Sequence, residues 1–220
     1  MSDKNKKISV SSMSSVAKKI LIATGNPGKF AELAQMLDEQ IGWVSLKDFP
    51  GIVPVKEDGR TFAENTRKKA LGYAKQTGLW TIADDSGLVI DALGGAPGVN
   101  SARFSGAIDA DRKIIDRKNY EKVLMLLKDV PAEKKTARFV CCLCLASPEK
   151  ILIETEGTLE GLIIDKPIGE NGFGYDPIFF VPGLNKTVAQ LGSAQKNLIS
   201  HRGCAVQKLK PLFEKLLLGD

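Results

Sequence analysis

Two adjacent carboxylates, Asp84 and Asp85, follow an apolar stretch of the sequence and precede Ser86 and Gly87. Consecutive side chains of an extended chain point in opposite directions. We therefore expect the two aspartates to have different tasks, one binding a metal or activating water and the other anchoring the backbone. Asp and Ser are also common in turns without a chemical role, but the glycine-rich segment GGAPGVNSARFSG that follows favours a functional site.

A polar turn between a predicted strand and a predicted helix is suited to binding phosphate. Such a junction directs backbone N–H groups and the positive end of the helix dipole toward one point. The segment lacks the spacing of a Walker A loop and the G-x-G-x-x-G of dinucleotide-binding proteins. On its own, an ordinary glycine turn explains it equally well. The candidate phosphate-binding residues are Thr24, Gly25, Asn26, Pro27, Gly28 and Lys29.

Glu57 is a further candidate for a metal-binding carboxylate. It lies shortly before a helix whose start is predicted by a capping box formed by Thr61 and Glu64. Glu64 therefore has a structural role, whereas Glu57 has no obvious one. Magnesium favours one or two carboxylates together with phosphate oxygens and water. On the same helix, Asn65 and Lys69 are four residues apart and share a face.

Two segments in the C-terminal half have the composition of a nucleobase site. In GFGYDP, the glycines that flank Phe173 leave its ring accessible for base stacking, although a buried Phe in a turn fits this pattern as well. In SHRG, the single histidine, His201, stands beside Arg202 near the predicted end of a helix. Taken alone, a histidine there is more often a C-terminal cap than a ligand.

The spacing of apolar residues predicts alternating strands and helices that position these side chains. Strands are predicted at 19–23, on either side of an acidic turn within 81–93, at 138–146 and 151–164 as a hairpin, and at 178–181. Helices are predicted at 29–39, 61–77 and 109–128, from about 193 to just past His201, and after Gly203 to the C-terminus. The segment 44–55 contains Pro50, Gly51 and Pro54 and is predicted to be irregular. This order indicates an α/β fold with one mixed central sheet flanked by helices.

The composition and the distribution of charge exclude several classes of protein. No apolar run reaches 18 residues, so no transmembrane helix and no membrane partner are expected. The formal net charge is +5, but residues 1–19 carry +4 and the rest carries +1, which leaves no basic face for nucleic acid. We predict a disordered, basic, Ser-rich tail at 1–17, without the apolar segment of a secretory signal, and a single domain at 18–220. The cysteines Cys141, Cys142, Cys144 and Cys204 are predicted to be reduced, as in a cytoplasmic protein.

Taken together and in this order, the motifs resemble those of the inosine triphosphate pyrophosphatase family. The resemblance covers nearly all of the chain from about Ile20 and rests on the segments ATGNPGK, TFAEN, ADDSGL, LGGAPGVNSARFSG, GFGYDPIF and ISHRG. It implies two lobes around an active-site cleft, a homodimer, and hydrolysis of ITP, dITP and XTP to a monophosphate and pyrophosphate. The implied reaction uses Mg²⁺ and attack of water on the α-phosphorus.

The resemblance also implies roles for individual residues. Asp85 is expected to be the proton acceptor and, with Glu57, a magnesium ligand, while Lys69 assists at the phosphates; whether Asp84 also contacts the metal stays open. The substrate-binding residues are expected to be Thr24, Gly25, Asn26, Pro27, Gly28, Lys29, Ser86 and Lys196 at the triphosphate, and Phe173, Gly174, Tyr175, Asp176, His201 and Arg202 at the base.

Two other functions are weighed against this one. A pyrophosphatase for other damaged nucleotides, such as modified pyrimidines, is the nearest alternative, and the GFGYDP and SHR segments argue against it. A nucleic-acid-binding protein that uses the basic N-terminal residues is the other, and the clustered acids of the central motifs argue against that.

Overall fold

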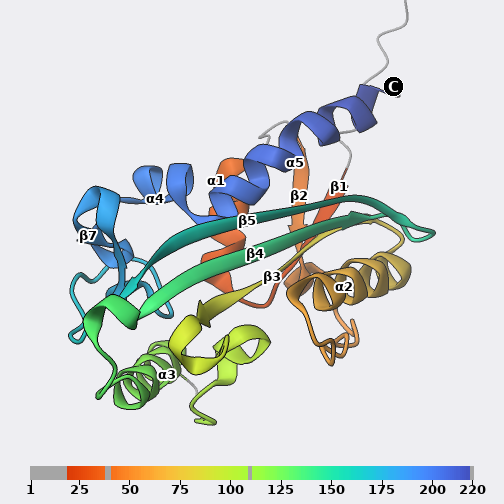
Figure 1. Cartoon of the computed structure of the whole chain (residues 1–220). Helices are drawn as coiled ribbons and strands as arrows, with labels where there is room; N and C mark the ends of the chain where they lie inside the picture. Colours follow the sequence, from red (N-terminus) through yellow and green to blue (C-terminus); the bar gives the residue numbers. More distant parts are fainter. Residues whose placement is uncertain (1–18, 38–40, 109–110, 219–220) are drawn as a thin grey trace, which may run out of the picture.

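The computed structural model describes residues 19–37, 41–108 and 111–218; the predicted tail at 1–17 lies outside the described residues. The strands form one seven-stranded mixed sheet in the order β2-β1-β3-β4-β5-β6-β7 (Figure 1). β1 pairs in parallel with β2 and with β3, and the remaining neighbours are antiparallel. The strands are β1 (Lys19–Ala23), β2 (Gly42–Ser45), β3 (Trp80–Ile90), β4 (Thr136–Ala146), β5 (Ile151–Ile163), β6 (Phe179–Val181) and β7 (Lys186–Thr187).

Helices cover both faces of this sheet. The α-helices are α1 (Pro27–Met36), α2 (Phe62–Thr77), α3 (Arg112–Leu126), α4 (Ser193–Ile199) and α5 (His201–Leu218). α2 packs on one face through a small-residue cluster that includes Ala70 and Ala83. α1 and α5 pack on the other face around Ile22, Ile82 and Val206. Within the described residues, no helix is both long and apolar enough to cross a bilayer.

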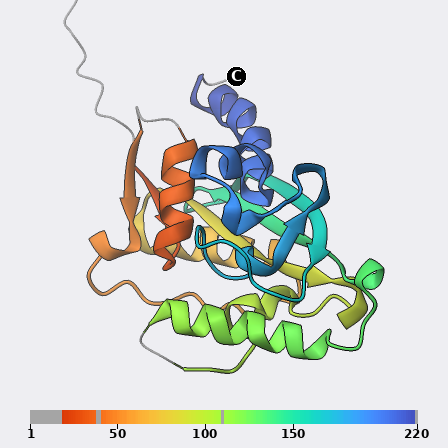
Figure 2. The ribbon, with the colours of Figure 1, turned by 90° about the vertical axis from the view of Figure 1, so that its left-hand side faces the viewer.

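The sheet extends into a second lobe with its own core. This core gathers the far ends of β3, β4 and β5, where Leu88, Phe139 and Ile163 pack with Phe179 of β6 and Val123 of α3. α3 lies on the side of the sheet away from α5 (Figure 2). The long strands β3 to β5 therefore run through both lobes, and the predicted α/β fold with a mixed, helix-flanked sheet is confirmed.

The end of β1 creates the space between the lobes. β1 stops at Ala23, which pairs with Ala83 of β3, but β3 continues to Ile90. The first β3 residues beyond this last pair are Asp84, Asp85 and Ser86. In open α/β sheets, ligands bind outside the carboxyl ends of parallel strands where the strand order changes, and β1 and β3 end their pairing at such a point.

Several local predictions are confirmed. Thr61 caps α2 by accepting a hydrogen bond from Glu64 N, and Gly78 ends that helix with a left-handed φ of 72°. The Glu64 carboxylate accepts a hydrogen bond from Arg60 N at 2.7 Å instead of one from Thr61 N. The β4–β5 hairpin turns where the sequence predicts it. The helices predicted at 29–39 and 109–128 are present as α1 and α3, but α1 begins earlier, at Pro27, and the two helices end earlier, at Met36 and Leu126. The predicted helix residues 38, 39, 109 and 110 lie outside the described part of the chain.

Two strand predictions are wrong. The acidic turn within 81–93 does not exist, because β3 is one continuous strand in which Asp84 and Asp85 pair with Leu143 and Cys142 of β4. Charged partners on both faces satisfy these carboxylates, so they do not interrupt the ladder. The segment 44–55 is not irregular throughout, since its first two residues belong to β2, a short edge strand next to β1.

The predicted boundary near the C-terminus is also wrong. α4 ends before Ser200, and His201 begins α5 instead of ending the preceding helix. Gly203 does not separate two helices, because it lies within α5 and is buried. A Cβ atom at this position would lie 1.9 Å from the carbonyl oxygen of Asn197. The glycine therefore permits close approach of α4 and α5.

A second close approach, between β5 and α5, gives a test of this packing. A Cβ atom on Gly157 would lie 2.2 Å from His201 O and 2.5 Å from Ala205 N. Gly157→Ala is expected to lower the free energy of unfolding by about 1–3 kcal/mol through overpacking. Gly183→Ala is the control, because Gly183 has no atom within 4 Å of its Cβ position. Equal denaturant midpoints for the two variants would contradict the packing described.

Candidate active site

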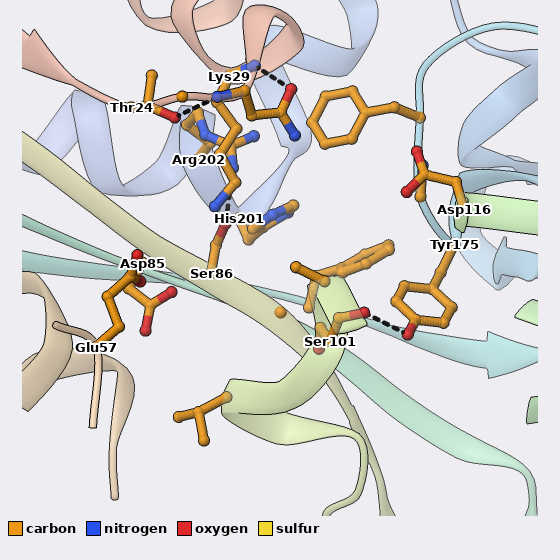
Figure 3. Close-up of a pocket in the computed structure, with 18 of the residues that line it drawn as sticks. Thr24, Lys29, Glu57, Asp85, Ser86, Ser101, Asp116, Tyr175, His201 and Arg202 are labelled. Atoms are coloured by element: carbon orange, nitrogen blue, oxygen red, sulfur yellow. Dashed lines mark hydrogen bonds between the residues drawn. The ribbon is translucent and has the colours of Figure 1, made fainter. Parts of the chain in front are cut away.

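A cleft of about 240 Å³ lies between the lobes, at the end of β1. Figure 3 shows that Thr24 and Lys29 project into it from one lobe, while Asp116 and Tyr175 line the opposite side. Glu57 and Asp85 lie together at one end, and Ser86, His201 and Arg202 lie between the two groups. Segments that are far apart in the sequence thus converge on one space.

Asp84 is the buried anchor of the site. Its side chain points toward α1 and α5, where it pairs with Lys29 and, at 3.1 Å, with Arg202 Nε. Ser86 Oγ and Cys141 Sγ also donate to this carboxylate, at 3.3 and 3.0 Å. Burial opposes its ionisation, but Arg202 and Lys29 outweigh burial and hold the pKa of Asp84 well below its usual range. The negative charge of Asp84 is therefore compensated by cations of the protein itself.

Asp85 points to the opposite face, toward α2, as expected for neighbouring residues of a strand. Asn65 Nδ2 donates to its Oδ2 at 3.0 Å, and Lys69 Nζ lies 3.8 Å from its Oδ1. Burial raises the pKa of Asp85 above its ordinary value despite the nearby lysines. A carboxylate that lines the cleft with a raised pKa is a better proton acceptor than an exposed aspartate.

Lys69 connects Asp85 with Glu57. Its Nζ lies 2.9 Å from Glu57 Oε2 and donates to Asp84 O at 2.5 Å. Burial lowers the pKa of Lys69, but Asp85 and Glu57 outweigh burial and raise it above the usual value. Lys69 is therefore a fixed positive charge at the end of the cleft where the two candidate metal ligands meet.

The predicted phosphate turn is shaped by its own side chains. Asn26 caps α1 and accepts hydrogen bonds from Gly28 N at 2.9 Å and Lys29 N at 3.4 Å. Thr24 Oγ1 in turn accepts from Asn26 N at 3.1 Å. Thr24, Gly25, Asn26 and Lys29 line the cleft, whereas Pro27 and Gly28 form the first turn of α1 without lining it.

The segment 172–176 closes the other end of the cleft. Asp176 accepts from Phe173 N at 2.9 Å and pairs with Lys196 at 2.6 Å. Lys196 Nζ also lies 4.5 Å from the centroid of the Phe173 ring and 2.8 Å from Glu32 Oε1. The ring packs on α1, since a Cβ on Gly28 would lie 2.8 Å from it. Phe173 therefore touches both lobes.

His201 and Arg202 lie where α5 begins. The Arg202 side chain is 1% exposed and donates from Nη1 to Glu32 at 2.5 Å and from Nη2 to Ser86 Oγ at 2.8 Å, besides its bond to Asp84. His201 stacks on Phe139 with ring centroids 4.8 Å apart. Its buried Nδ1 has no hydrogen-bond partner among the described residues. Burial and the neighbouring Arg202 hold the pKa of His201 well below its usual value, so the ring is neutral.

The structure brings together nearly all predicted site residues. The ones that line the cleft are Thr24, Gly25, Asn26, Lys29, Glu57, Lys69, Asp85, Ser86, Phe173, Gly174, Tyr175, Asp176, Lys196, His201 and Arg202. Glu32 and Asp116 were not predicted from the sequence. Asp116 shares the inward face of α3 with Val123, seven residues later, so a charged residue on an apolar stripe was the available signal. Glu32 offers no such signal.

These observations define an α/β protein whose inter-lobe cleft combines a helix-start turn, lysines and acidic side chains, as a phosphorylated ligand requires. The chain belongs to the Ham1 family, whose model matches residues 20–212.

Relatives and solved structures agree with this assignment. The chain is 46% identical over 202 residues to the dITP/XTP pyrophosphatase of Desulforamulus reducens, covering 91% of this chain and 98% of that protein. It is 48% identical to that of Shouchella clausii, covering 89% and 96%. The structure of a HAM1 protein from Coxiella burnetii superposes with a TM-score of 0.80 at 39% identity, covering 90% of this chain and 99% of that one.

Loss of charge is expected to destabilise the protein strongly at Asp84 but only slightly at its neighbour Asp85. Asp84→Asn leaves Lys29 and Arg202 without their buried anion, so we expect a loss of about 3–5 kcal/mol in the free energy of unfolding. Burial already disfavours the charged form of Asp85, so Asp85→Asn is expected to stay within about 1 kcal/mol of wild type. Urea unfolding of both variants measures this difference. An equal loss in both would contradict the division of roles.

The only histidine of the chain gives a pH-dependent prediction. The pKa of buried His201 is lowered on folding, so the stability from its neutral form is present above the unfolded pKa of about 6.5 and is lost as pH falls. Between pH 7.5 and 5.5, this loss is expected to reach up to about 1.4 kcal/mol. The pH dependence of unfolding should be shallower in His201→Gln. Parallel profiles would show that folding leaves the pKa of His201 unchanged and would contradict this prediction.

Proposed function

We propose that this protein hydrolyses deaminated purine nucleoside triphosphates, ITP, dITP and XTP, to the nucleoside monophosphate and pyrophosphate. The relatives above carry the name dITP/XTP pyrophosphatase and match about nine-tenths of the chain. The observation that carries the proposal is that the two neighbouring aspartates of β3 have different partners. Asp84 is neutralised within the protein, whereas Asp85 faces the cleft beside Lys69 and Glu57.

The charges of the site fit a requirement for magnesium. Lys29 and Lys69 already pair with Asp84 and Glu57, and Lys196 and Arg202 already pair with Glu32. A triphosphate therefore brings negative charge that these cations do not fully compensate.

The donor set fits the same ion. Glu57 and Asp85 would hold it, because magnesium takes one or two carboxylates together with phosphate oxygens and water. The described residues contain no cluster of three or more His, Cys, Asp or Glu arranged to enclose a metal. When bound, magnesium neutralises charge on the phosphates.

The residues of the chain supply the remaining chemistry. Asp85 accepts a proton from the water that attacks the α-phosphorus, and the bond from this phosphorus to the bridging oxygen of the pyrophosphate breaks. Lys69 and Lys29 stabilise negative charge on the phosphates, aided by polar groups of Thr24 and Ser86. Water attack requires no covalent nucleophile.

The base is assigned to the end of the cleft formed by residues 173–176, His201 and Arg202. Hypoxanthine and xanthine carry an acceptor oxygen at purine position 6, where adenine carries a donor amino group. A donor at this position satisfies the oxygen and opposes the amino group, and a buried unpaired polar group costs about 1–3 kcal/mol. Because Arg202 is held by Glu32, Asp84 and Ser86, its removal would also disrupt the core and is a poor test of base selectivity.

Two further properties belong to the proposal. The protein works as a homodimer, and it works in the cytoplasm. The cysteines support the second point, since Cys141, Cys142, Cys144 and Cys204 are all free thiols, as is usual in a reducing compartment.

Pyrophosphate release from a panel of nucleoside triphosphates, with and without Mg²⁺, tests the proposed function. ITP and XTP should be turned over far faster than ATP, and chelation should abolish the reaction. Asp85→Asn keeps the shape of the side chain but removes the proton acceptor and a metal-binding charge, so turnover should fall at least ~10²-fold. Asp58→Asn is the control, since Asp58 pairs with Lys56 and Lys68 on the surface. Near-normal activity of folded Asp85→Asn would overturn the role of Asp85.

A further inference from the structure

Asp116 is a carboxylate of the cleft to which the motifs assign no role. Asp116 lies in the second turn of α3 and is only 7% exposed. It lines the cleft on the side of Tyr175 (Figure 3). Asp85 and Glu57 lie at the other end of the cleft in the same view. Asp116 therefore faces the part of the cleft assigned to the base and not the part assigned to the phosphates.

One oxygen of Asp116 fixes the segment that carries Phe173. Its Oδ2 accepts a hydrogen bond from Gly174 N at 2.9 Å. Gly174 has a left-handed φ of 65°, and the next residue, Tyr175, donates from its hydroxyl to Ser101 O at 2.7 Å. These two bonds hold the segment against α3 and the 3₁₀ helix Gly98–Arg103, so the position of the Phe173 backbone depends on Asp116.

The other oxygen of Asp116 is buried without a hydrogen-bond donor among the described residues. Arg112 Nε lies 2.9 Å from Oδ1 and forms an ion pair with it, but this contact does not have the geometry of a hydrogen bond. An unsatisfied buried acceptor is costly, and fixing Gly174 N requires only one oxygen. A second oxygen that lacks a donor at the wall of a cleft has the property of an acceptor for a ligand.

We propose that Asp116 is a specificity-determining residue whose Oδ1 accepts a hydrogen bond from the ring N1–H of a 6-oxopurine base. This inference rests on the proposed function. Hypoxanthine and xanthine carry a proton on N1 next to the oxygen at position 6, whereas N1 of adenine is an acceptor. An ionised carboxylate accepts hydrogen bonds and donates none. Asp116 therefore pairs with the 6-oxopurines and repels adenine, independently of any donor that reads the oxygen.

The first experiment compares kcat/KM for ITP and ATP in Asp116→Asn and wild type. Asn retains an oxygen for Gly174 N but turns an amide N–H₂ donor toward the cleft. The ITP/ATP ratio is expected to fall at least ~10-fold, within the range for a lost buried hydrogen bond. Glu121→Gln is the matched control, because it makes the same change on the half-exposed face of α3 and should leave the ratio unchanged.

Other outcomes separate this role from a structural one. If Asp116 only held the Phe173 segment, or accepted from a ribose hydroxyl, Asp116→Asn would weaken ITP and ATP by the same factor, and the proposal would be wrong.

A second measurement uses wild-type protein and so does not depend on whether the variant folds. Triphosphates of inosine and N1-methylinosine differ in the proton at N1. Wild type should prefer the unmethylated substrate at least ~10-fold, and Asp116→Ala, which removes the acceptor and its bulk, should reduce that preference. Equal rates on the two substrates in wild type would overturn the assignment of Asp116. Failure of wild type to release pyrophosphate from ITP at all would instead overturn the proposed function.

Discussion

The buried carboxylate of Asp84 is the interaction on which the rest of the site depends. It is surrounded by Lys29 from α1 and Arg202 from α5, and each of these cations is placed by a different part of the chain. A single buried charge without partners costs several kcal/mol, so β3, α1 and α5 are held in one arrangement. That arrangement also fixes the turn before α1 and the start of α5, and both of these segments line the cleft.

Neighbouring side chains of a β-strand point to opposite faces of the sheet, so the position of Asp84 also determines where Asp85 points. Because Asp84 faces α1 and α5, Asp85 must face α2, where Asn65 and Lys69 meet it. The protein neutralises one carboxylate with its own cations and leaves the other in the cleft with a raised pKa. A shift of one residue in the register of β3 would exchange these positions, so the pairing of β3 with β4 is itself a requirement for the site.

Local signals in the sequence predicted the elements that depend on local interactions. The Thr61 cap, the Gly78 terminus and the β4–β5 hairpin are of this kind. Errors arose where tertiary contacts decide the outcome. A turn was predicted at Asp84 and Asp85 because the partners of their buried ion pairs are far away in the sequence. A helix end was predicted at Gly203 because its contact with α4 cannot be inferred from the neighbouring residues. The candidate site was largely predicted from its motifs, but Glu32 and Asp116 lie outside those motifs and act through long-range pairs.

The two ends of the cleft differ in how a ligand can be bound. At the end proposed to bind the phosphates, Lys29 and Lys69 already have carboxylate partners, so a triphosphate gains mainly by exchanging one ion pair for another. Such an exchange yields little net free energy and discriminates poorly between triphosphates, because all of them carry the same phosphates. At the opposite end, Asp116 Oδ1 and His201 Nδ1 are buried and have no hydrogen-bond partner among the described residues. A base that satisfies them forms hydrogen bonds that the free protein lacks, and a base that does not leaves them unpaired. Under the proposed function, selectivity is therefore concentrated at the end of the cleft assigned to the base, although the reaction is assigned to the other end.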